Sequence, residues 1–391
     1  MSATHHCQVC GNKNIQRFFE MPPMPTQDGI MCDSREDALA FPSGSIDLHF
    51  CHDCSYIGNE GYEPDKISFD AYDFSLDHSP LFGQYIEGLA DALIETYGLR
   101  QKQILDIGCG DGGFLEVICR RGNNRGIGID SGFDHSRRKK TEGASIRYIQ
   151  DYYSEKYREL APDFVCCRLV IDLLDDPGMI LRSIRQNLEG RPNVPVFIEV
   201  PSAQYTFGER VIWNVVYEHR SWFSPVSLTC LMESCGFEVV ETKSLWNDEF
   251  IGVVGLPNRE AKPASVVDKE VQKMKKMIRG FRQDFAILLE RSSSQLQQIK
   301  REGIRTLAWG AGARGVTFLN LFELGEHIQY IVDINTKRQG KFVPGSAQQI
   351  VAPEFICDFQ PQLIVITNPT YADEIKQQVK DLGVESDFWV L

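Results

Sequence analysis

Ile104-Leu105-Asp106-Ile107-Gly108-Cys109-Gly110-Asp111-Gly112-Gly113 is the stretch that decides the fold of the central part of the chain. It begins as a short apolar strand and ends in glycines, after which Gly113 to Arg120 has helical spacing. Glycines accept positive φ and let the backbone approach a ligand closely. The stretch therefore predicts a strand, a turn that holds a ligand, and a helix.

Further strands and helices alternate on both sides of this stretch. Nine strands are expected after it, five before residue 260 and four in the last third of the chain, and a long helical pattern spans about Val266 to Arg301. The expected strands of the central unit are 126–130, 146–149, 164–167, 196–200 and 237–243, and those of the last unit are 306–309, 328–333, 363–367 and 387–390. This alternation predicts an α/β fold with two open, mostly parallel, Rossmann-like sheets.

The glycine turn is preceded by an acid, and a second acid ends the next strand. Asp106 lies inside the strand end, and Asp130 follows Gly110 by twenty residues. A D-x-G-x-G turn resembles that of class I methyltransferases, in which it holds the amino-acid part of S-adenosylmethionine, whose ammonium favours a nearby acid. Asp130 is then expected on the ribose hydroxyls and Asp151 near the adenine. The cofactor-binding residues expected on these grounds are Asp106, Gly108, Cys109, Gly110, Asp130 and Asp151. A dinucleotide site is the alternative for the same glycines and acids.

Length and charge narrow the class of protein. The chain has 391 residues, which is too long for one core, and a formal net charge of -13. The acidic balance argues against a nucleic-acid partner, because phosphate neutralisation needs a basic face. No apolar run approaches the roughly 20 residues of a membrane span, and no signal peptide is visible. A cytoplasmic protein with a small-molecule substrate and no membrane partner is expected.

Two C-x-x-C pairs lie in the first 54 residues, which are rich in turn residues and short of apolar runs. Each pair can place two thiolates on one tetrahedral metal, and two pairs complete a closed structural site. The sequence thus predicts a zinc site made of Cys7, Cys10, Cys51 and Cys54. Rival ligands are His5, His6, Cys32 and His49, and the alternative is four unpaired cysteines.

The whole arrangement resembles the nucleotide-sugar C-methyltransferases of deoxysugar biosynthesis. The motifs that carry the resemblance are the two cysteine pairs, Glu199-Val200-Pro201, Tyr217-Glu218-His219-Arg220-Ser221-Trp222-Phe223-Ser224, Trp309-Gly310-Ala311-Gly312-Ala313-Arg314-Gly315 and Lys341-Phe342-Val343-Pro344-Gly345. The resemblance implies three domains: a zinc-binding domain over residues 1–70, a methyltransferase domain over 71–260, and a long helix with a Rossmann-like substrate domain over 261–391.

The resemblance also implies roles for individual residues. His219 takes the place of the family's general base, in a motif with Tyr217 and Glu218, and a histidine of ordinary pKa suits proton removal from a carbon next to a ketone. Tyr72 and Ser75 lie in a segment similar to one that covers the cofactor. The residues expected at the substrate, including a diphosphate or carrier site at the last glycine turn, are Arg168, Glu199, Gly312, Arg314 and Asn368.

Four departures from the family pattern fall where substrate would be handled. Val216 and Tyr217 stand where the family has tyrosine and histidine. Arg168 and Asp172 replace an asparagine and a histidine, and Asn247-Asp248-Glu249-Phe250 replaces a glycine-rich stretch. These departures leave S-adenosylmethionine-dependent methyl transfer as the expected activity and make the nucleotide-linked keto sugar the less secure part.

Three alternative functions remain open from the sequence. One is O- or N-methylation of another small metabolite on the same scaffold. A second is a non-catalytic nucleotide-binding protein. The third is a NAD-dependent oxidoreductase, since Gly310-x-Gly312-x-x-Gly315 and Asp333 form a plausible dinucleotide fingerprint.

Overall fold

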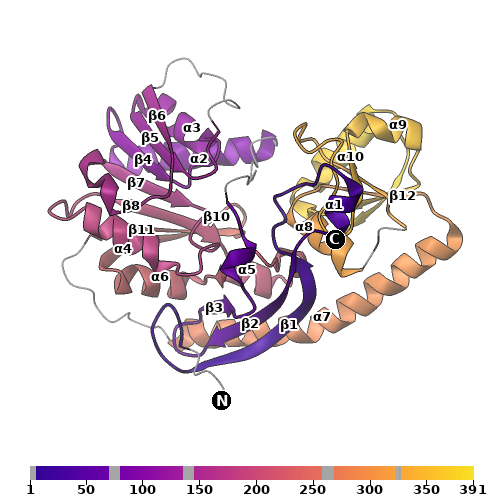
Figure 1. Ribbon diagram of the computed structural model, residues 1–391, viewed down its shortest axis with the longest axis horizontal. Coiled ribbons are helices and arrows are strands. Elements are labelled where there is room, and N and C mark those ends of the chain that lie inside the picture. Colours follow the sequence, from indigo (N-terminus) through magenta and orange to yellow (C-terminus); the bar gives the residue numbers. More distant parts are fainter. Residues whose placement is uncertain (1–5, 70–79, 135–144, 258–267, 323, 325–326) are drawn as a thin grey trace.

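The structure is a computed structural model that describes residues 6–69, 80–134, 145–257, 268–322, 324 and 327–391. Within this part of the chain the strands form three sheets of four, seven and five strands. Figure 1 shows the seven-stranded and five-stranded sheets as two lobes, with the four-stranded sheet and a long helix below and between them. The predicted α/β fold with two Rossmann-like units is confirmed.

The seven-stranded sheet has the order β10-β11-β8-β7-β4-β5-β6. Five of its strands are parallel, and β11 runs antiparallel to both β8 and β10, so a hairpin closes one edge. The bounds are β4 Gln103–Ile107, β5 Arg125–Asp130, β6 Ser145–Gln150, β7 Phe164–Arg168, β8 Val196–Pro201, β10 Phe237–Leu245 and β11 Phe250–Pro257. Strand order reverses between β4 and β7, which is where parallel sheets of this kind open a crevice for a ligand.

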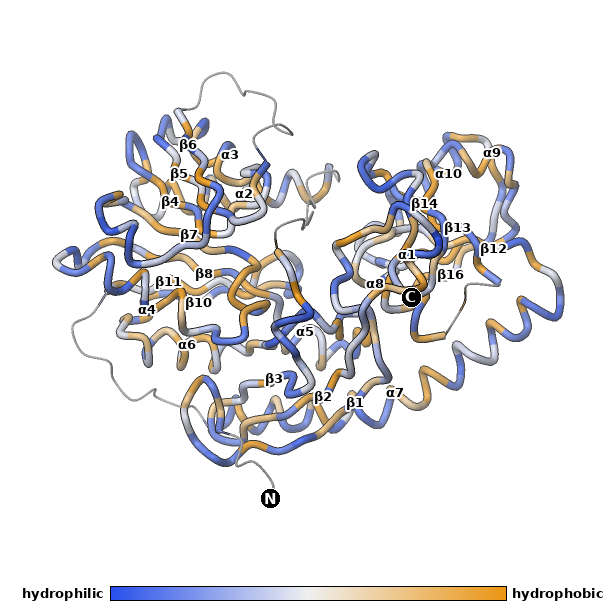
Figure 2. The backbone as a smooth tube through the Cα atoms, in the orientation of Figure 1, coloured by the Kyte–Doolittle hydropathy of each residue, from blue (hydrophilic) through white to orange (hydrophobic). Residues whose placement is uncertain are grey.

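Helices cover this sheet because its central strands are apolar on both faces. Strands β4, β7 and β8 are buried at nearly every position, and Figure 2 shows hydrophobic colour along them. The helices of this lobe are α2 Pro80–Tyr97, α3 Gly113–Gly122, η2 Glu155–Leu160, α4 Gly178–Asn187, α5 Ala203–Gly208, η3 Ile212–Asn214 and α6 Pro225–Ser234. Helix α2 packs on α3, and α6 packs on the β10–β11 hairpin.

The N-terminal segment forms an antiparallel sheet of order β1-β2-β3-β9. Its elements are β1 Ile15–Pro25, α1 Arg35–Leu39, β2 Ser43–Cys51, β3 Ile57–Asn59, η1 Pro64–Lys66 and β9 Ser221–Trp222. The proline-rich end of β1 is extended, and register shifts at Arg17/Phe19 and Met21/Met24 accommodate it. Strand β9 comes directly after His219, so the sheet includes residues from outside the expected 1–70 boundary.

A single helix, α7 Asp268–Glu302, leads to the last lobe. The five parallel strands there have the order β14-β13-β12-β15-β16. The bounds are β12 Thr306–Trp309, α8 Ala313–Leu321, β13 Tyr330–Val332, β14 Gln349–Val351, η5 Pro353–Phe355, α9 Ile356–Phe359, β15 Leu363–Ile366, η6 Pro369–Tyr371, α10 Ala372–Asp381 and β16 Asp387–Val390. Here the order reverses between β12 and β15, beside the second glycine turn.

One apolar core joins the three parts. It contains Phe19 and Met21 of β1, Phe207 of α5, Phe281 of α7 and Phe318 of α8. Phe281 packs edge-on against Phe19 and Phe207, at ring-centroid distances of 5.1 and 5.0 Å. The N-terminal sheet thus packs against both lobes and fixes one relative to the other. No helix within the described part of the chain has the length and apolar character that crossing a bilayer demands.

Candidate active site

The first glycine turn forms the floor of a cavity at the carboxyl ends of β4, β5 and β7. Gly108, Gly110 and Gly112 all have positive φ, of 68°, 52° and 79°. Gly108 also lacks room for a side chain, since a Cβ there would lie 2.3 Å from Val170 Cγ2. Gly110 has nothing within 4 Å of its Cβ position, so its backbone faces open space.

Two buried carboxylates flank this turn. Asp130 accepts hydrogen bonds from the N–H groups of Gly110 and Gly132, at 2.9 and 2.8 Å, and thereby fixes the turn. Cys166 donates its thiol to Asp106 Oδ1 at 3.3 Å. Burial raises the pKa of Asp106 to about 7 and raises the pKa of Asp130 as well.

The charges lining this cavity distinguish between ligand classes. Asp106, Asp111, Asp130 and Asp151 all line it, and Arg168 is the guanidinium among its lining residues. A dinucleotide diphosphate needs N–H donors and cations, whereas the sulfonium and ammonium of S-adenosylmethionine match an acid-lined cavity. The residues present therefore fit S-adenosylmethionine. Six of the residues expected at the cofactor line this cavity: Asp106, Gly108, Cys109, Gly110, Asp130 and Asp151.

Asp151 has other partners besides the cavity. Its Oδ1 accepts the N–H of Tyr152 at 2.8 Å, and its Oδ2 accepts the hydroxyl of Tyr157 at 2.5 Å. Lys156 pairs with the same oxygen and lowers the pKa of Asp151. Tyr152 itself is 61% exposed and lines the cavity, and the sequence analysis did not single it out. The predicted cofactor residues Tyr72 and Ser75 lie outside the described residues.

Two predicted substrate residues, Arg168 and Glu199, occupy different positions from those expected. Arg168 lines the cofactor cavity, with its guanidinium 4.3 Å from the centre of the Phe114 ring. Glu199 is fully buried, and it accepts hydrogen bonds from Arg168 Nε at 2.7 Å and from the Tyr85 hydroxyl at 2.8 Å. The expected contact between Glu199 and the substrate is therefore corrected, because the Glu199 carboxylate already accepts hydrogen bonds from Arg168 and Tyr85 and so orients Arg168.

A second cavity lies between the two lobes. Its lining comes from the loops after β7 and β8, from the β10–β11 turn and from the glycine turn of the last lobe, and includes Asp28, Asp172, Glu218, His219, Glu249, Gly312, Arg314, Asp333, Arg338 and Asn368. Leu169 and Leu173 line both cavities, so the two cavities share a wall. Leu169 has a φ of 56°, a strained conformation for a bulky residue, at this wall.

His219 lies at the wall of this inter-lobe cavity, with a side chain that is 15% exposed. Burial lowers the pKa of His219 to about 4, so the imidazole is neutral at pH 7. Its Nε2 is 3.6 Å from Asp172 Oδ2, and its ring packs edge-on against Trp222 at a centroid distance of 5.6 Å. Burial raises the pKa of Asp172 to about 7.

The loop that carries His219 is held from both sides. The N–H groups of Arg220 and Ser221 donate to the Asp172 carbonyl at 2.9 and 3.0 Å. Arg220 donates from Nη1 to the Asn59 carbonyl at 2.6 Å, and Asn59 returns a bond to the Arg220 carbonyl at 2.9 Å. The N-terminal sheet and the β7 loop together position the histidine.

Glu218 and Tyr217 precede His219 and have different environments. Glu218 is buried and lines the inter-lobe cavity beside Asp28, whose pKa is raised by burial. Tyr217 does not line either cavity: it stacks on Tyr62, accepts the N–H of Glu63 at 2.8 Å and donates to the Gly61 carbonyl at 3.1 Å. The expected catalytic role of Tyr217 is therefore corrected, because its hydroxyl is already hydrogen-bonded to Glu63 and Gly61 of the N-terminal domain.

The predicted residues of the last lobe do reach the inter-lobe cavity. Gly312 is the N-cap of helix α8, and Asn368 is the N-cap of η6. Arg314 is buried and donates to Asn214, Asn368 and Glu249, each at 2.7 Å. Glu249, which the sequence analysis named only as part of a departure from the family pattern, balances its charge.

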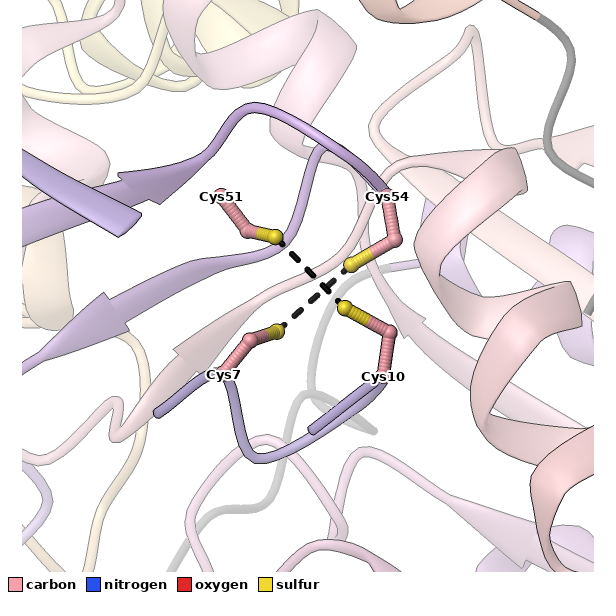
Figure 3. A group of neighbouring side chains, drawn as sticks. All are labelled: Cys7, Cys10, Cys51 and Cys54. Atoms are coloured by element: carbon pink, nitrogen blue, oxygen red, sulfur yellow. Dashed lines mark hydrogen bonds between the residues drawn. The ribbon is translucent and has the colours of Figure 1, made fainter. Parts of the chain in front are cut away.

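Four thiols converge at the edge of the N-terminal sheet (Figure 3). The Sγ atoms of Cys7 and Cys54 are 3.6 Å apart, as are those of Cys10 and Cys51, and all four lie within 4.8 Å of one another. A tetrahedral zinc with Zn–S bonds of about 2.3 Å requires sulfur separations of about 3.8 Å. The rival ligand Cys32 pairs instead with Phe342, and His6 is exposed. The donor set and spacing fit a structural zinc.

Comparisons with known proteins agree with this geometry. Residues 81–242 match a methyltransferase domain, and residues 259–390 match a C-methyltransferase C-terminal domain. The C-methyltransferase NovU of Streptomyces niveus is 25% identical over 96% of this chain and 92% of its own. A ubiquinone biosynthesis O-methyltransferase of Neisseria meningitidis is 26% identical over 43% of this chain and 74% of its own. Another, of Aeromonas salmonicida, is 31% identical over 36% of this chain and 65% of its own.

These matches differ in how much of the chain they cover. The O-methyltransferases cover less than half of it, whereas the C-methyltransferase match runs through all three sheets. The expected resemblance is confirmed. The chain is an S-adenosylmethionine-dependent methyltransferase, and the findings support a C-methyltransferase.

Proposed function

We propose that this S-adenosylmethionine-dependent methyltransferase methylates a carbon next to a carbonyl group, in a nucleotide-linked keto sugar or a similar small molecule. The observation that carries the proposal is the position of His219. Its neutral imidazole faces an inter-lobe cavity that shares the Leu169 and Leu173 wall with the cofactor cavity.

The residues that line the two cavities would have different roles. The Gly108–Gly110 turn with Asp106 and Asp130 would hold the methyl donor, and Asp151 and Tyr152 line its far end. S-adenosylmethionine, when bound, supplies an electrophilic methyl group on a sulfonium. A carbon next to a ketone must lose a proton before it becomes nucleophilic, and His219 is the base placed to take that proton. The shared wall places the base next to the donor cavity.

The last lobe would hold the remainder of the acceptor. Helix α8 begins at Ala313 after its N-cap Gly312, which provides no side-chain hydrogen bond, and both residues line the inter-lobe cavity. The first N–H groups of the helix would favour a phosphate there. Arg314 and Asn368 lie beside this helix end. The charge of Arg314 is already balanced by Glu249, so the helix amides are the stronger argument for an anionic handle.

The four thiols would bind one structural zinc. Its role would be to fold the loop-rich N-terminal domain. Ser55 and Tyr56, which follow Cys54, bond through their hydroxyl groups to Ser224 at 2.5 Å and to Ser221 at 2.8 Å. Through these bonds the metal would stabilise the segment that follows His219.

A panel of nucleotide-linked keto sugars, tested with S-adenosylmethionine carrying a ¹³C-labelled methyl group, tests the proposal. We expect S-adenosylhomocysteine release and a product whose labelled methyl is bonded to carbon, as read by NMR. A labelled methyl on oxygen or nitrogen would establish the alternative O- or N-methyltransferase, for which the partial match to the ubiquinone enzymes is the supporting observation. No S-adenosylhomocysteine with any carbonyl acceptor would contradict the proposal.

Substitution of the base gives the first mutational prediction. His219→Asn should lower kcat by about 10²-fold or more, because a positioned base contributes that much. S-adenosylhomocysteine should still bind with unchanged affinity by calorimetry, since His219 does not line the cofactor cavity. His327→Asn, at a partly exposed histidine of the last lobe, is the control and should keep full turnover. Retained turnover in His219→Asn would remove His219 from the mechanism.

A further inference from the structure

Asp172 and His219 form a pair that the motif-based mechanism does not use. Asp172 replaces the residue that the resembling family has at this position, and it lies four residues beyond β7. Its side chain is 2% exposed, yet it lines the same inter-lobe cavity as His219. The two residues come from loops 47 positions apart that the main-chain bonds to the Asp172 carbonyl hold together.

The two side chains lie close together, but not all of their polar atoms have hydrogen-bond partners among the described residues. Asp172 Oδ2 and His219 Nε2 are 3.6 Å apart, which is too long for a direct hydrogen bond. The other two polar atoms, Asp172 Oδ1 and His219 Nδ1, are buried and have no hydrogen-bond partner among the described residues. Buried polar atoms are nearly always bonded, so an acid and a base left open at one cavity wall point to a ligand that completes them.

We propose that Asp172 is the acid partner of His219: its carboxyl group would hold the carbonyl oxygen of the acceptor while His219 takes the proton from the adjacent carbon. This inference rests on the proposed function. A carbonyl oxygen and the hydrogen on the neighbouring carbon lie close together, so two side chains 3.6 Å apart can contact both. The pKa directions agree, since burial lowers the pKa of His219 to about 4 and raises the pKa of Asp172 to about 7, so that between these values the imidazole is neutral and the carboxyl is protonated.

The proton steps balance. The C–H bond breaks, its proton goes to His219, and its electron pair forms the carbon–carbon double bond of an enol as the carbonyl oxygen takes the proton of Asp172. When the carbon–methyl bond forms, the sulfur–methyl bond of the donor breaks and its electron pair stays on sulfur as a thioether, while the oxygen returns its proton to Asp172 and the carbonyl is restored. His219 then releases the proton to solvent. One proton leaves for each methyl transferred, so the acid is regenerated in every cycle.

Other charged groups surround the pair and set its electrostatics. Glu218 precedes His219 and Asp28 faces the same cavity from the loop after β1. Arg220 follows His219, but its guanidinium pairs with Glu60 at 3.5 Å and with Asp175 at 3.3 Å. Arg314 and Arg338 also line the cavity, paired with Glu249 and Asp333, and burial is the cause that favours a protonated Asp172 over an ionised one.

An NMR titration of the whole chain tests the pair without any acceptor. The chain is labelled with [¹³Cε1]histidine, loaded with S-adenosylhomocysteine and titrated between roughly pH 5 and 9. The signal of His219 is assigned by its absence in His219→Asn. We expect a step near pH 7 in the wild-type signal, because ionisation of Asp172 places a charge 3.6 Å from Nε2. Asp172→Asn should abolish this step, and Asp172→Glu should restore one at a shifted pH.

Asp175→Asn is the matched control, since it removes a carboxylate from the same loop that is 58% exposed and pairs with Arg220. The step should persist in it. A wild-type signal without a step near pH 7, or a step that survives in Asp172→Asn, would overturn the pairing even if carbon methylation is established. If a step is found but no carbonyl acceptor is methylated, the proposed function fails and the pair stands. On a methylated acceptor, Asp172→Asn should lower kcat about 10²-fold at unchanged S-adenosylhomocysteine affinity.

Discussion

At the scale of single residues, the cofactor turn is fixed by two constraints on one glycine. Gly108 has a φ of 68° and would meet Val170 at 2.3 Å if it had a Cβ. A left-handed conformation costs a non-glycine residue about 1–2 kcal/mol, and the contact adds to that cost. Gly108→Ala should therefore weaken S-adenosylhomocysteine binding about tenfold or more, as measured by calorimetry.

A matched glycine separates the two constraints. Gly98 has a φ of 64° but nothing within 4 Å, and it lies outside the cofactor cavity. Gly98→Ala should cost stability without changing S-adenosylhomocysteine affinity. Gly108→Ala combined with Val170→Ala should recover part of the affinity, because the side-chain contact is relieved while the backbone cost remains. Equal affinities in the wild type and Gly108→Ala would show that the turn tolerates a shift.

Asp106 makes cofactor binding depend on pH. Burial raises the pKa of Asp106 to about 7, so the empty site holds a largely protonated carboxyl below pH 7. The ammonium of the cofactor favours the ionised form, and binding below pH 7 must therefore release a proton. Affinity should rise as pH increases from about 6 to 8 and then level off, by about tenfold per unit below the pKa. Calorimetry in buffers of different ionisation enthalpy measures both the affinity and the proton release.

The same carboxyl predicts the sign of a stability change. A folded pKa of about 7 lies above the unfolded value of about 3.9, so the folded chain binds more protons between these limits. The contribution of Asp106 to stability is fully present below the unfolded pKa and is lost as pH rises through about 7.

Asp106→Asn should remove the pH dependence of affinity. A pH-independent affinity in the wild type would contradict the assignment of Asp106 to the ammonium.

At the scale of elements, the N-terminal sheet links the four-cysteine cluster to the His219 loop. Strand β3 pairs with β9 through Ile57 and Trp222, directly after the His219 loop. Structural zinc sites of four cysteines contribute about 10–16 kcal/mol in small peptides, which is ample to fold a domain of this kind. Cys10→Ser, or removal of zinc by a chelator, should lower the Tm and increase hydrogen exchange over residues 217–224.

Metal content and a control cysteine test this link. Elemental analysis should give one zinc per chain, and less in Cys10→Ser. Cys357→Ser changes an exposed cysteine of the last lobe and should leave zinc content, Tm and exchange unchanged. A zinc-free chain with an unaltered Tm and unaltered exchange at the His219 loop would show that the thiols fold the domain without metal.

The sequence predicts elements whose signals are local and misses those set by pairing partners. Alternating apolar runs located most strands of both parallel sheets, because parallel strands are buried on both faces. Strand β11 was not predicted, although its turn carries Glu249, because an antiparallel edge hairpin has no glycine motif or helix to mark it. Strand β1 was not predicted either, since its proline-rich end is tolerated only through the register shifts of an antiparallel pair.

The candidate site was predictable where a motif determines a backbone conformation. Gly108, Gly110 and Asp130 were found because the turn that they form is local. Tyr217 was placed beside His219 by adjacency in sequence, but consecutive side chains point in different directions and its hydroxyl bonds to Glu63. Asp172 and Glu249 reach the inter-lobe cavity through tertiary packing, which no spacing in the sequence reveals.

At the scale of the whole molecule, one buried guanidinium connects the two lobes. Arg314 of α8 donates to Glu249 of the β10–β11 turn and to Asn214 of η3, both in the other lobe. Thr370 of the last lobe also donates to Glu249, at 2.6 Å. Because this network forms one wall of the inter-lobe cavity, the arrangement of the lobes and the polarity of the acceptor site depend on the same side chains.

Breaking the network from one side should be costly. Arg314→Lys keeps the positive charge but cannot donate in the three directions of the guanidinium, and a buried polar partner left unbonded typically costs about 1–3 kcal/mol. We expect a lower free energy of unfolding, a lower Tm, and a wider distribution of lobe separations in small-angle scattering. Lys337→Met is the control: Lys337 also bridges the lobes, to Asp111 at 2.9 Å, but this exposed pair should contribute about 1 kcal/mol or less.

Replacing both partners distinguishes a structural role from a functional one. A well-packed apolar pair can match or exceed the stability of a buried ion pair, so Arg314→Met with Glu249→Leu should recover much of the Tm lost in Arg314→Lys. Turnover should not recover, because Asn368 would lose its Arg314 partner at 2.7 Å and the cavity would lose its polar wall. If the double variant regained both Tm and turnover, Arg314 and Glu249 would only stabilise the contact between the lobes. Acceptor recognition would then have to come from the α8 amides and the residues around His219.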